Sequence, residues 1–339
     1  MTADIAIAPA EIQLVLNQFD RTRLEVSSPL HGLDVATLEA NQTRYRFLHL
    51  AGPDDFETPG IEAWGAEIDE TPLYTDLRDS LLYAGVARYE NIGAFYERRR
   101  MLQTLSKGVR FVLDTNTFYH GFPEWSGLDG DEFMIPDVVR DEITSGLNWK
   151  YRPGDIATLK RSTLRANAAL LDELANQRTK RARRATHFAL AQLQRITDDA
   201  TQLQSDEGST SDKEENDARI VRTARAFEQE KNRLPVMLTA DQNLATLCRA
   251  RGVEAFLFVL PGENLPGSTG FGEVCRWLCA LAAVWGVVKV NSVLLFSEWR
   301  GRTDQRYPVK VRFLNDGMAN DCIRDLQLCR ELGALGIER

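Results

Sequence analysis

The feature that most constrains the fold is a short apolar run that stops at an acidic residue. Residues 110–113 form such a run, and Asp114 follows it directly. A buried parallel strand with a polar group at its carboxyl end has this pattern. A second apolar run, residues 236–238, is followed after two residues by Asp241. Because chemistry in open α/β sheets collects at the carboxyl ends of the strands, we expect Asp114 and Asp241 to lie on one edge.

Strand and helix patterns alternate around these two acids. The expected strands are residues 110–113, 133–135, 236–238 and 256–260, and the expected helices open at Pro136–Asp137, Asp217 and Asp241. This alternation predicts an α/β domain over residues 107–261, with a small parallel sheet flanked by helices. Within it, residues 155–204 are rich in Ala, Leu, Arg and Gln and predict an inserted helical pair. Residues 115–131 are aromatic and Gly-rich and predict a loop.

The chain is long enough for two or three domains, and two further parts are expected outside this segment. Residues 1–106 hold 17 acids and 9 arginines and are expected to be an acidic, mainly helical N-terminal region. Residues 261–270 contain two Pro and three Gly, as a linker would. Residues 271–339 are then expected to form a small α+β C-terminal domain from a helix, two strands and a final helix.

Composition points to a cytoplasmic protein. The sequence holds no run of eighteen apolar residues, so no membrane span is expected. The polar, acidic start of the chain does not resemble a signal peptide. The five cysteines are odd in number and form no CxxC pair, which favours small buried side chains in a reducing compartment.

Two further acids are expected to join Asp114 and Asp241. Glu142 follows two valines by three and four residues on one expected helix, so it shares their buried face. Asp217 precedes the apolar positions of the next helix by the same spacing. A buried carboxylate is costly unless a cation compensates it. Oxygen ligands of this kind suit Mg²⁺ or Mn²⁺, which can activate a water molecule and stabilise phosphoryl oxygens.

Each acid also has a structural explanation of its own. Asp217 and Asp241 stand where a helix N-cap would stand, and Asp is a common N-cap. Asp114 could be a turn residue at the end of a strand. Glu142 is the hardest to explain in this way, because it interrupts an apolar stripe. The metal hypothesis therefore depends on the convergence of all four acids.

Four short motifs resemble those of the PIN-domain nucleases. They are FVLDTN at residues 111–116, IPDVVRDEI at 135–143, DARIV at 217–221 and LTAD at 238–241. The resemblance implies a small parallel sheet flanked by helices, an active site of three or four acids that binds Mg²⁺ or Mn²⁺, and endonuclease activity, usually on RNA. By matched position, the metal ligands and catalytic residues would be Asp114, Glu142, Asp217 and Asp241.

The same matching implies two supporting residues. Thr239 would support the last acid, and Asn116 would support the first. The chain departs from the family in two places. The segment after Asp114 usually contains a helix, where a loop is expected here, and the interval of 75 residues between Glu142 and Asp217 is long.

A basic run within the expected helical insertion is a candidate nucleic-acid surface. Residues 148–204 hold 11 bases and 5 acids, a net charge of +6 in a chain whose overall charge is −8. The candidate contacts to the phosphate backbone are Arg178, Lys180, Arg181, Arg183 and Arg184. A solvated helix face is the alternative.

The hypothesis that these features favour is a metal-dependent endoribonuclease with an acidic Mg²⁺ or Mn²⁺ centre. Two alternatives stay open, which are a non-catalytic RNA-binding scaffold with a PIN-like fold and a structure-selective DNA nuclease. The expected partner is nucleic acid, with RNA favoured. A homodimer, or a protein partner bound through the N-terminal region, is also considered.

Overall fold

The chain divides into two compact units, which are described separately below. The computed structural model describes residues 4–19, 23–57, 72–145, 152–162, 168–174, 185–205, 209–210, 212–264, 266–297 and 309–337. Unit 1 consists of Met1–Ser80, Lys150–Ala182 and Glu263–Arg339, and unit 2 consists of Leu81–Trp149 and Arg183–Gly262. The segments on both sides of unit 2 in the sequence share one sheet in unit 1.

Unit 2 is built on a parallel sheet, so the predicted α/β fold is confirmed. Among the described residues its strand order is β7-β6-β5-β8-β9, and every neighbouring pair is parallel. The strands are β5 (Val109–Leu113), β6 (Phe133–Pro136), β7 (Thr201–Leu203), β8 (Leu234–Thr239) and β9 (Glu254–Leu257). Leu113 is the register partner of Leu238, so the carboxyl ends of β5 and β8 lie side by side.

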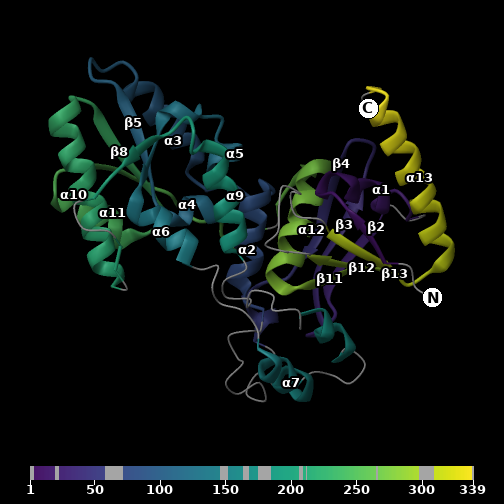
Figure 1. The fold of residues 1–339 in the computed structure, drawn as a ribbon. Helices are drawn as coiled ribbons and strands as arrows, with labels where there is room; N and C mark the ends of the chain where they lie inside the picture. The colour runs from purple at the N-terminus through teal and green to yellow at the C-terminus, as the bar shows by residue number, and fades with distance from the viewer. Residues whose placement is uncertain are drawn as a thin grey trace. The chain divides into compact units, whose positions relative to one another are not determined.

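Helices flank this sheet, as Figure 1 shows. They are α3 (Ile92–Leu102), α4 (Thr115–Tyr119), α5 (Phe122–Trp125), α6 (Asp137–Ser145), α9 (Thr186–Ile196), α10 (Lys213–Lys231) and α11 (Gln242–Ala250). The apolar stripe predicted on α6 is buried, with Val138, Val139 and Ile143 fully inaccessible. Helix α10 contacts α6, α11, β7 and β8, so it lies against α6, which carries Glu142, and against β8, which leads to Asp241.

Helix α3 is part of the core of unit 2 although it precedes residue 107. Its Phe95 is 1% exposed and sits at the centre of an aromatic cluster. The ring centroids of its partners lie 5.4–5.7 Å away, and the partners are Phe111, Phe122, Phe256 and Phe258. Edge-to-face and tilted pairs at this spacing are favourable beyond the area that they bury.

The prediction of a loop over residues 115–131 is wrong. Helix α4 begins directly after Asp114, whose backbone carbonyl accepts a 2.6 Å hydrogen bond from the Thr117 hydroxyl. Gly121, with φ +65°, separates α4 from α5. These helices of five and four residues are too short to show a helical period in the sequence. Their aromatic residues Phe118 and Phe122 are fully buried and so belong to the core.

The expected helical pair over residues 155–204 is divided between the units. Helix α7 (Pro153–Ser162) and the short 3-10 helix η6 (Ala168–Leu174) belong to unit 1, whereas α9 and β7 belong to unit 2. Strand β7 was not predicted, because three residues carry no readable period. This strand forms because it pairs with β6, a tertiary contact that its own three residues do not predict.

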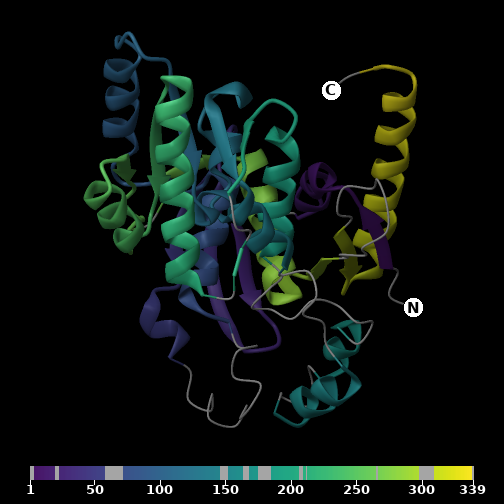
Figure 2. The ribbon, with the colours of Figure 1, turned by 60° about the vertical axis from the view of Figure 1, so that its left-hand side comes forward.

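Unit 1 is organised around an antiparallel sheet that joins the two ends of the chain. In the described residues its order is β1-β13-β12-β11-β2-β3-β4-β10. The strands are β1 (Asp4–Ile7), β2 (Arg23–Ser28), β3 (Leu33–Ala40), β4 (Arg44–Leu50), β10 (Ser268–Gly270), β11 (Val287–Val290), β12 (Val293–Ser297) and β13 (Val309–Phe313). In Figures 1 and 2 the purple N-terminal strands accordingly lie beside the yellow C-terminal segment.

The prediction of a mainly helical N-terminal region is wrong for residues 23–40, which form β2 and β3. Besides α3, the helices described within residues 1–106 are α1 (Ile12–Leu16), the short 3-10 helices η1 (Pro9–Glu11) and η2 (Pro53–Phe56), and α2 (Tyr74–Ala84). In β2, Leu24 and Val26 are buried while Glu25 is exposed, which is the period-two pattern of a half-buried strand. The partner of Val26 in β11 is Val290, so the pairing that stabilises β2 comes from the far end of the chain.

The C-terminal elements follow the expectation closely. Helix α12 (Phe271–Trp285) contacts β11 and β12, and α13 (Asp316–Ala334) closes the chain. The single strand expected over residues 287–296 is instead the hairpin of β11 and β12. Asn291 takes φ +48° at its turn, a conformation that Asn tolerates better than most residues. No helix in the described ranges is both long enough and apolar enough to span a membrane.

We expect Gly121→Ala to destabilise unit 2 through crowding. An added Cβ at Gly121 would lie 2.7 Å from the Tyr83 carbonyl oxygen, at a φ of +65°. Gly127 has a similar φ of +68° but no atom within 4 Å, so Gly127→Ala is the matched control. Urea denaturation should show a loss of about 2–3 kcal/mol for the first variant and about 1 kcal/mol for the second. Equal losses would contradict the crowding.

Candidate metal centre

Asp114 lies buried at the carboxyl end of β5, with 6% of its surface exposed. Its Oδ2 atom accepts hydrogen bonds from the Thr239 hydroxyl at 2.7 Å and from the Asn116 amide at 3.2 Å. Its backbone N–H donates to the Leu238 carbonyl at the end of β8. The carboxylate is therefore held in one orientation by groups from two adjacent strand ends.

Thr239 joins the first acid to the last. Its hydroxyl donates to Asp114 and accepts a 2.8 Å hydrogen bond from the backbone N–H of Asp241. The predicted partner of Thr239 was Asp241, and the structure places it against both acids. Asn116 lies beside Asp114, the acid with which it was paired in the prediction.

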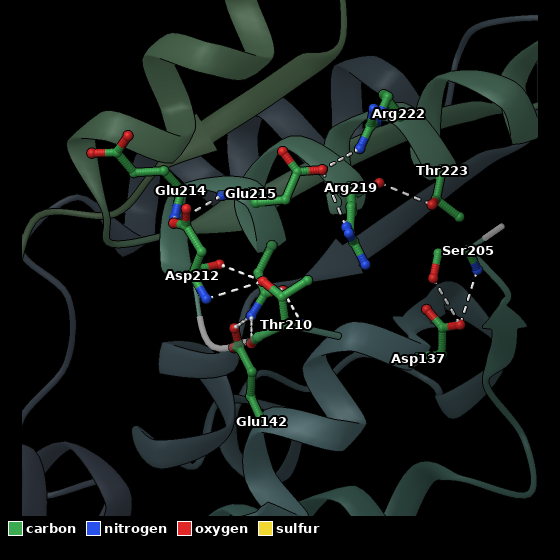
Figure 3. A network of polar contacts seen from close by, with 11 residues as sticks. Asp137, Glu142, Ser205, Thr210, Asp212, Glu214, Glu215, Arg219, Arg222 and Thr223 are labelled. Carbon is green, nitrogen blue, oxygen red and sulfur yellow. Dashed lines mark hydrogen bonds and ion pairs between the residues drawn. The ribbon is translucent and has the colours of Figure 1, made fainter. Parts of the chain in front are cut away.

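Glu142 projects from α6 and is fixed by two polar side chains that the sequence did not single out. Its Oε2 atom accepts a 2.5 Å hydrogen bond from the Thr115 hydroxyl, and its Oε1 atom accepts one of 3.0 Å from the Asn216 amide. Asn216 is 3% exposed and lies on the second turn of α10. Figure 3 shows Glu142 in the network that continues through Thr210 and Asp212.

Asp217 lies within α10 and does not cap it. The helix begins at Lys213, and its N-cap is Asp212, whose side chain accepts hydrogen bonds from the backbone N–H groups of Glu214 and Glu215. The helix start expected at Asp217 is therefore four residues too late. The N-cap, Asp212, lies in a stretch whose composition is typical of a loop. Because Asp212 caps the helix, capping does not explain the presence of Asp217.

Asp241 serves as a helix cap and as half of an ion pair. Its Oδ1 atom accepts hydrogen bonds from the backbone N–H groups of Asn243 and Leu244 at the start of α11. Its Oδ2 atom lies 2.9 Å from the Lys213 ammonium. Lys213 was not predicted, because a lysine in an acidic, Ser-rich stretch has the appearance of a solvated residue.

Hydrogen bonds link the surroundings of the four acids, because Thr239 joins Asp114 to Asp241, and Thr115 and Asn216, the chain neighbours of Asp114 and Asp217, both contact Glu142. Burial raises the pKa of Asp114 to about 6, and the charges of Glu142 and Asp241 add to this while the Thr239 hydrogen bond opposes it. Burial, then repulsion by Asp114, raises the pKa of Asp217 to about 6 as well. Burial also acts to raise the pKa of Asp241, but the Lys213 ammonium and the α11 backbone N–H groups outweigh it and lower that pKa.

The donor set suits a hard divalent cation in kind. All four side chains offer carboxylate oxygens. The pKa values of Asp114 and Asp217 are raised, and a nearby positive charge would lower them. Within the part of the chain that the structure describes, however, no three such side chains stand close enough together to hold a metal ion as they are. Glu142 is turned to Thr115 and Asn216, and Asp241 to Lys213.

The five predicted nucleic-acid contacts lie outside the described residues. They are Arg178, Lys180, Arg181, Arg183 and Arg184. The predicted acids come from β5, α6, α10 and the turn between β8 and α11.

We expect Lys213 to compete with a divalent cation for the acidic centre. Its ammonium is hydrogen-bonded to Asp241 and also feels the charges of Asp217 and Asp114. Lys213→Met should therefore bind Mn²⁺ about fivefold more tightly, as measured by titration with electron paramagnetic resonance. Lys231→Met removes the same charge from the far end of α10 and should change the affinity less than about twofold. Weaker Mn²⁺ binding by Lys213→Met would contradict the competition.

The raised pKa of Asp114 should make the metal-free protein less stable as the pH rises. The pKa is about 6 in the folded protein, against about 3.9 for an unfolded Asp. Between these values the folded state binds more protons, so the free energy of unfolding falls with increasing pH, by as much as about 3 kcal/mol.

Asp114→Asn removes this ionisation. In EDTA, urea denaturation should show the variant to be more stable than the wild type at about pH 8, with the two converging near about pH 4. The pKa of Asp217 is also raised, so its ionisation lowers the stability of both proteins as the pH rises. The variant therefore keeps a weaker dependence of its stability on pH. A wild type whose stability rises from about pH 5 to 8 would contradict the assignment.

A comparison with protein families matches the segment that contains the four predicted acids. The family model described as the PIN domain matches residues 111–258. A solved structure of a domain of a functionally unknown protein from Methanocaldococcus jannaschii DSM 2661 matches with 17% sequence identity and a TM-score of 0.29, covering 47% of this chain and 96% of that chain. At this TM-score the likeness supports no conclusion about fold or function. No curated protein matches the chain.

The matched segment begins in β5, three residues before Asp114, and ends just after β9. It contains the parallel sheet and all four acids, and the motif resemblance found in the sequence is confirmed. The similarity to the PIN-domain family is therefore shown for residues 111–258.

Proposed function

We propose that the protein is a metal-dependent endonuclease that hydrolyses phosphodiester bonds in RNA. The observation that supports the proposal is a set of hydrogen bonds among four separate elements: Thr239 joins Asp114 to Asp241, and Thr115 and Asn216, the chain neighbours of Asp114 and Asp217, both contact Glu142. A purely structural role does not account for Asp114 and Asp217, whose pKa values are raised by burial and by neighbouring carboxylates. A nuclease centre accounts for them, because it needs negative charge that a cation compensates.

In this proposal the four acids hold Mg²⁺ or Mn²⁺, which when bound lowers the pKa of a water molecule and stabilises charge on the phosphoryl oxygens. The protein's contribution is to orient the ligands. Thr239 and Asn116 fix Asp114, and Thr115 and Asn216 fix Glu142. Hydrogen-bonding partners of this kind orient the ligands of a metal site, and Glu142 and Asp241 would turn from their present partners to bind the cation.

RNA is the proposed substrate because the family resemblance favours it, and the cytoplasm is the proposed location. The described cysteines are all free thiols, which suits a reducing compartment. The two alternatives make different demands. A non-catalytic scaffold would bind RNA without cutting it, whereas a structure-selective DNA nuclease would cut DNA of the same sequence faster.

The direct test is cleavage of a labelled single-stranded RNA by the full chain in Mn²⁺, Mg²⁺ or EDTA. We expect cleavage with either metal and none in EDTA, and a loss of at least about 100-fold in Asp114→Asn and Glu142→Gln. Asp141→Asn is the matched control. Asp141 is an exposed acid that precedes Glu142 on α6 and pairs with Ser209, so its rate should stay within about twofold.

Three outcomes would redirect the assignment. RNA binding without cleavage by the folded wild type would favour the scaffold. Faster cleavage of matched DNA would favour the DNA nuclease. An Asp141→Asn variant as impaired as Glu142→Gln would mean that the loss reflects the overall charge of α6, and the acidic centre would lose its support.

A further inference from the structure

A pocket of about 600 Å³ lies in unit 2 between β7 and the outer face of α10. All three residues of β7 line one wall, and the edge of this strand that faces away from β6 has no partner strand in the described residues. The opposite wall is helical and carries Arg219, Arg222 and Lys231 together with Glu230 and the ring of Phe227. The pocket thus combines cations, hydrogen-bonding groups and an aromatic surface.

The two arginines are held in place by one carboxylate. Glu215 Oε1 accepts hydrogen bonds from Arg219 Nε at 3.2 Å and from Arg222 Nη2 at 2.7 Å, and Figure 3 shows both guanidinium groups turned toward it. The Arg222 side chain is nevertheless 55% exposed. A guanidinium that is oriented by a carboxylate and still open to solvent is well placed to bind a phosphate.

The pocket lies further along α10 than the acidic centre, with Arg219 as its first lining residue on this helix. Lys213, Asn216 and Asp217 face the acids, while Glu215 anchors the arginines of the pocket. Arg222 follows Asp217 by five residues, which is about 7.5 Å along the helix axis. At its other end the pocket reaches Ser205, whose N–H and hydroxyl donate to Asp137 at the start of α6.

We propose that this β7–α10 pocket binds one nucleotide of the substrate RNA strand, next to the phosphate that is cleaved. The proposal rests on the proposed nuclease function and names where its substrate lies. Arg222 and Arg219 bind the phosphate of this nucleotide. Phe227 packs against its base, and polar groups of β7 contact the edges of the base and sugar.

Size and charge favour a nucleotide over a peptide. A pocket of about 600 Å³ falls within the range of small-ligand sites, whereas a strand added to β7 needs only an open edge. The lining holds three cations and one carboxylate, Glu230, and although Glu215 pairs with both arginines, the exposed Arg222 guanidinium is left open to an anion. The arginine pair decides between the two ligands, because a peptide that adds a strand to β7 would not need it.

The test is the affinity of the full chain for a short fluorescein-labelled single-stranded RNA, measured by anisotropy in EDTA so that no cleavage occurs. Arg222→Glu reverses the charge of the phosphate contact, and Ala226→Trp fills the pocket from an exposed helix position without changing charge. Each should weaken binding at least about tenfold. Arg222→Lys should retain most of the affinity, because the charge stays.

Matched controls come from α11. Arg249→Glu and Ala250→Trp make the same changes at exposed positions outside the pocket, and their affinities should stay within about threefold of the wild type. If the wild type binds RNA and both pocket variants bind it equally well, the pocket proposal is overturned while the nuclease proposal stands. This outcome is also the one that a peptide-binding edge would give.

Cleavage by the same proteins separates the two proposals. If wild-type affinity depends on the pocket but no metal supports cleavage, the nuclease proposal fails and the pocket assignment stands for a binding scaffold. If cleavage is metal-dependent, the pocket variants should raise KM at least about tenfold with a smaller change in kcat. A fall in kcat with unchanged KM would overturn the pocket as a substrate site.

Discussion

Negative charge at one edge of a parallel sheet is the constraint on which unit 2 depends. Asp114 is almost fully buried there, and its repulsion with Asp217 helps to raise the pKa of the latter to about 6. The fold tolerates this arrangement because hydrogen bonds from Thr239 and Asn116 stabilise Asp114 and an ammonium group pairs with Asp241. In the proposed function, a bound cation would lower the electrostatic cost of these acids further.

Helix α10 organises the surroundings of these acids. One turn after its Asp212 cap, Asn216 reaches Glu142 and Asp217 joins the acids, while Lys213 pairs with Asp241. The same turn carries Glu215, which holds the arginines of the neighbouring pocket. A change in the position of this single helix would therefore alter the acidic centre and the pocket together.

The parts of the site that could be predicted from the sequence are those set by local pattern. Asp114 and Asp241 were found because each follows a buried strand, and Glu142 because it interrupts an apolar stripe. The hydrogen-bonding partners Thr115 and Asn216 could not be found, because their roles depend on contacts across 27 and 74 residues. Lys213 was missed for a similar reason, since its partner lies 28 residues away.

The same limit applies to the fold. The parallel sheet was predictable because each of its longer strands is buried on both faces and reads as an apolar run. Strands β2 and β1 pair with β11 and β13 from the opposite end of the chain, and no local signal specifies those partners.

Phe95 shows the same limit in unit 2. It lies outside the segment that matches the PIN domain, yet its ring packs against four phenylalanines within that segment. The physical boundary of the nuclease-like unit is therefore earlier than its motifs suggest, because a core is bounded by packing.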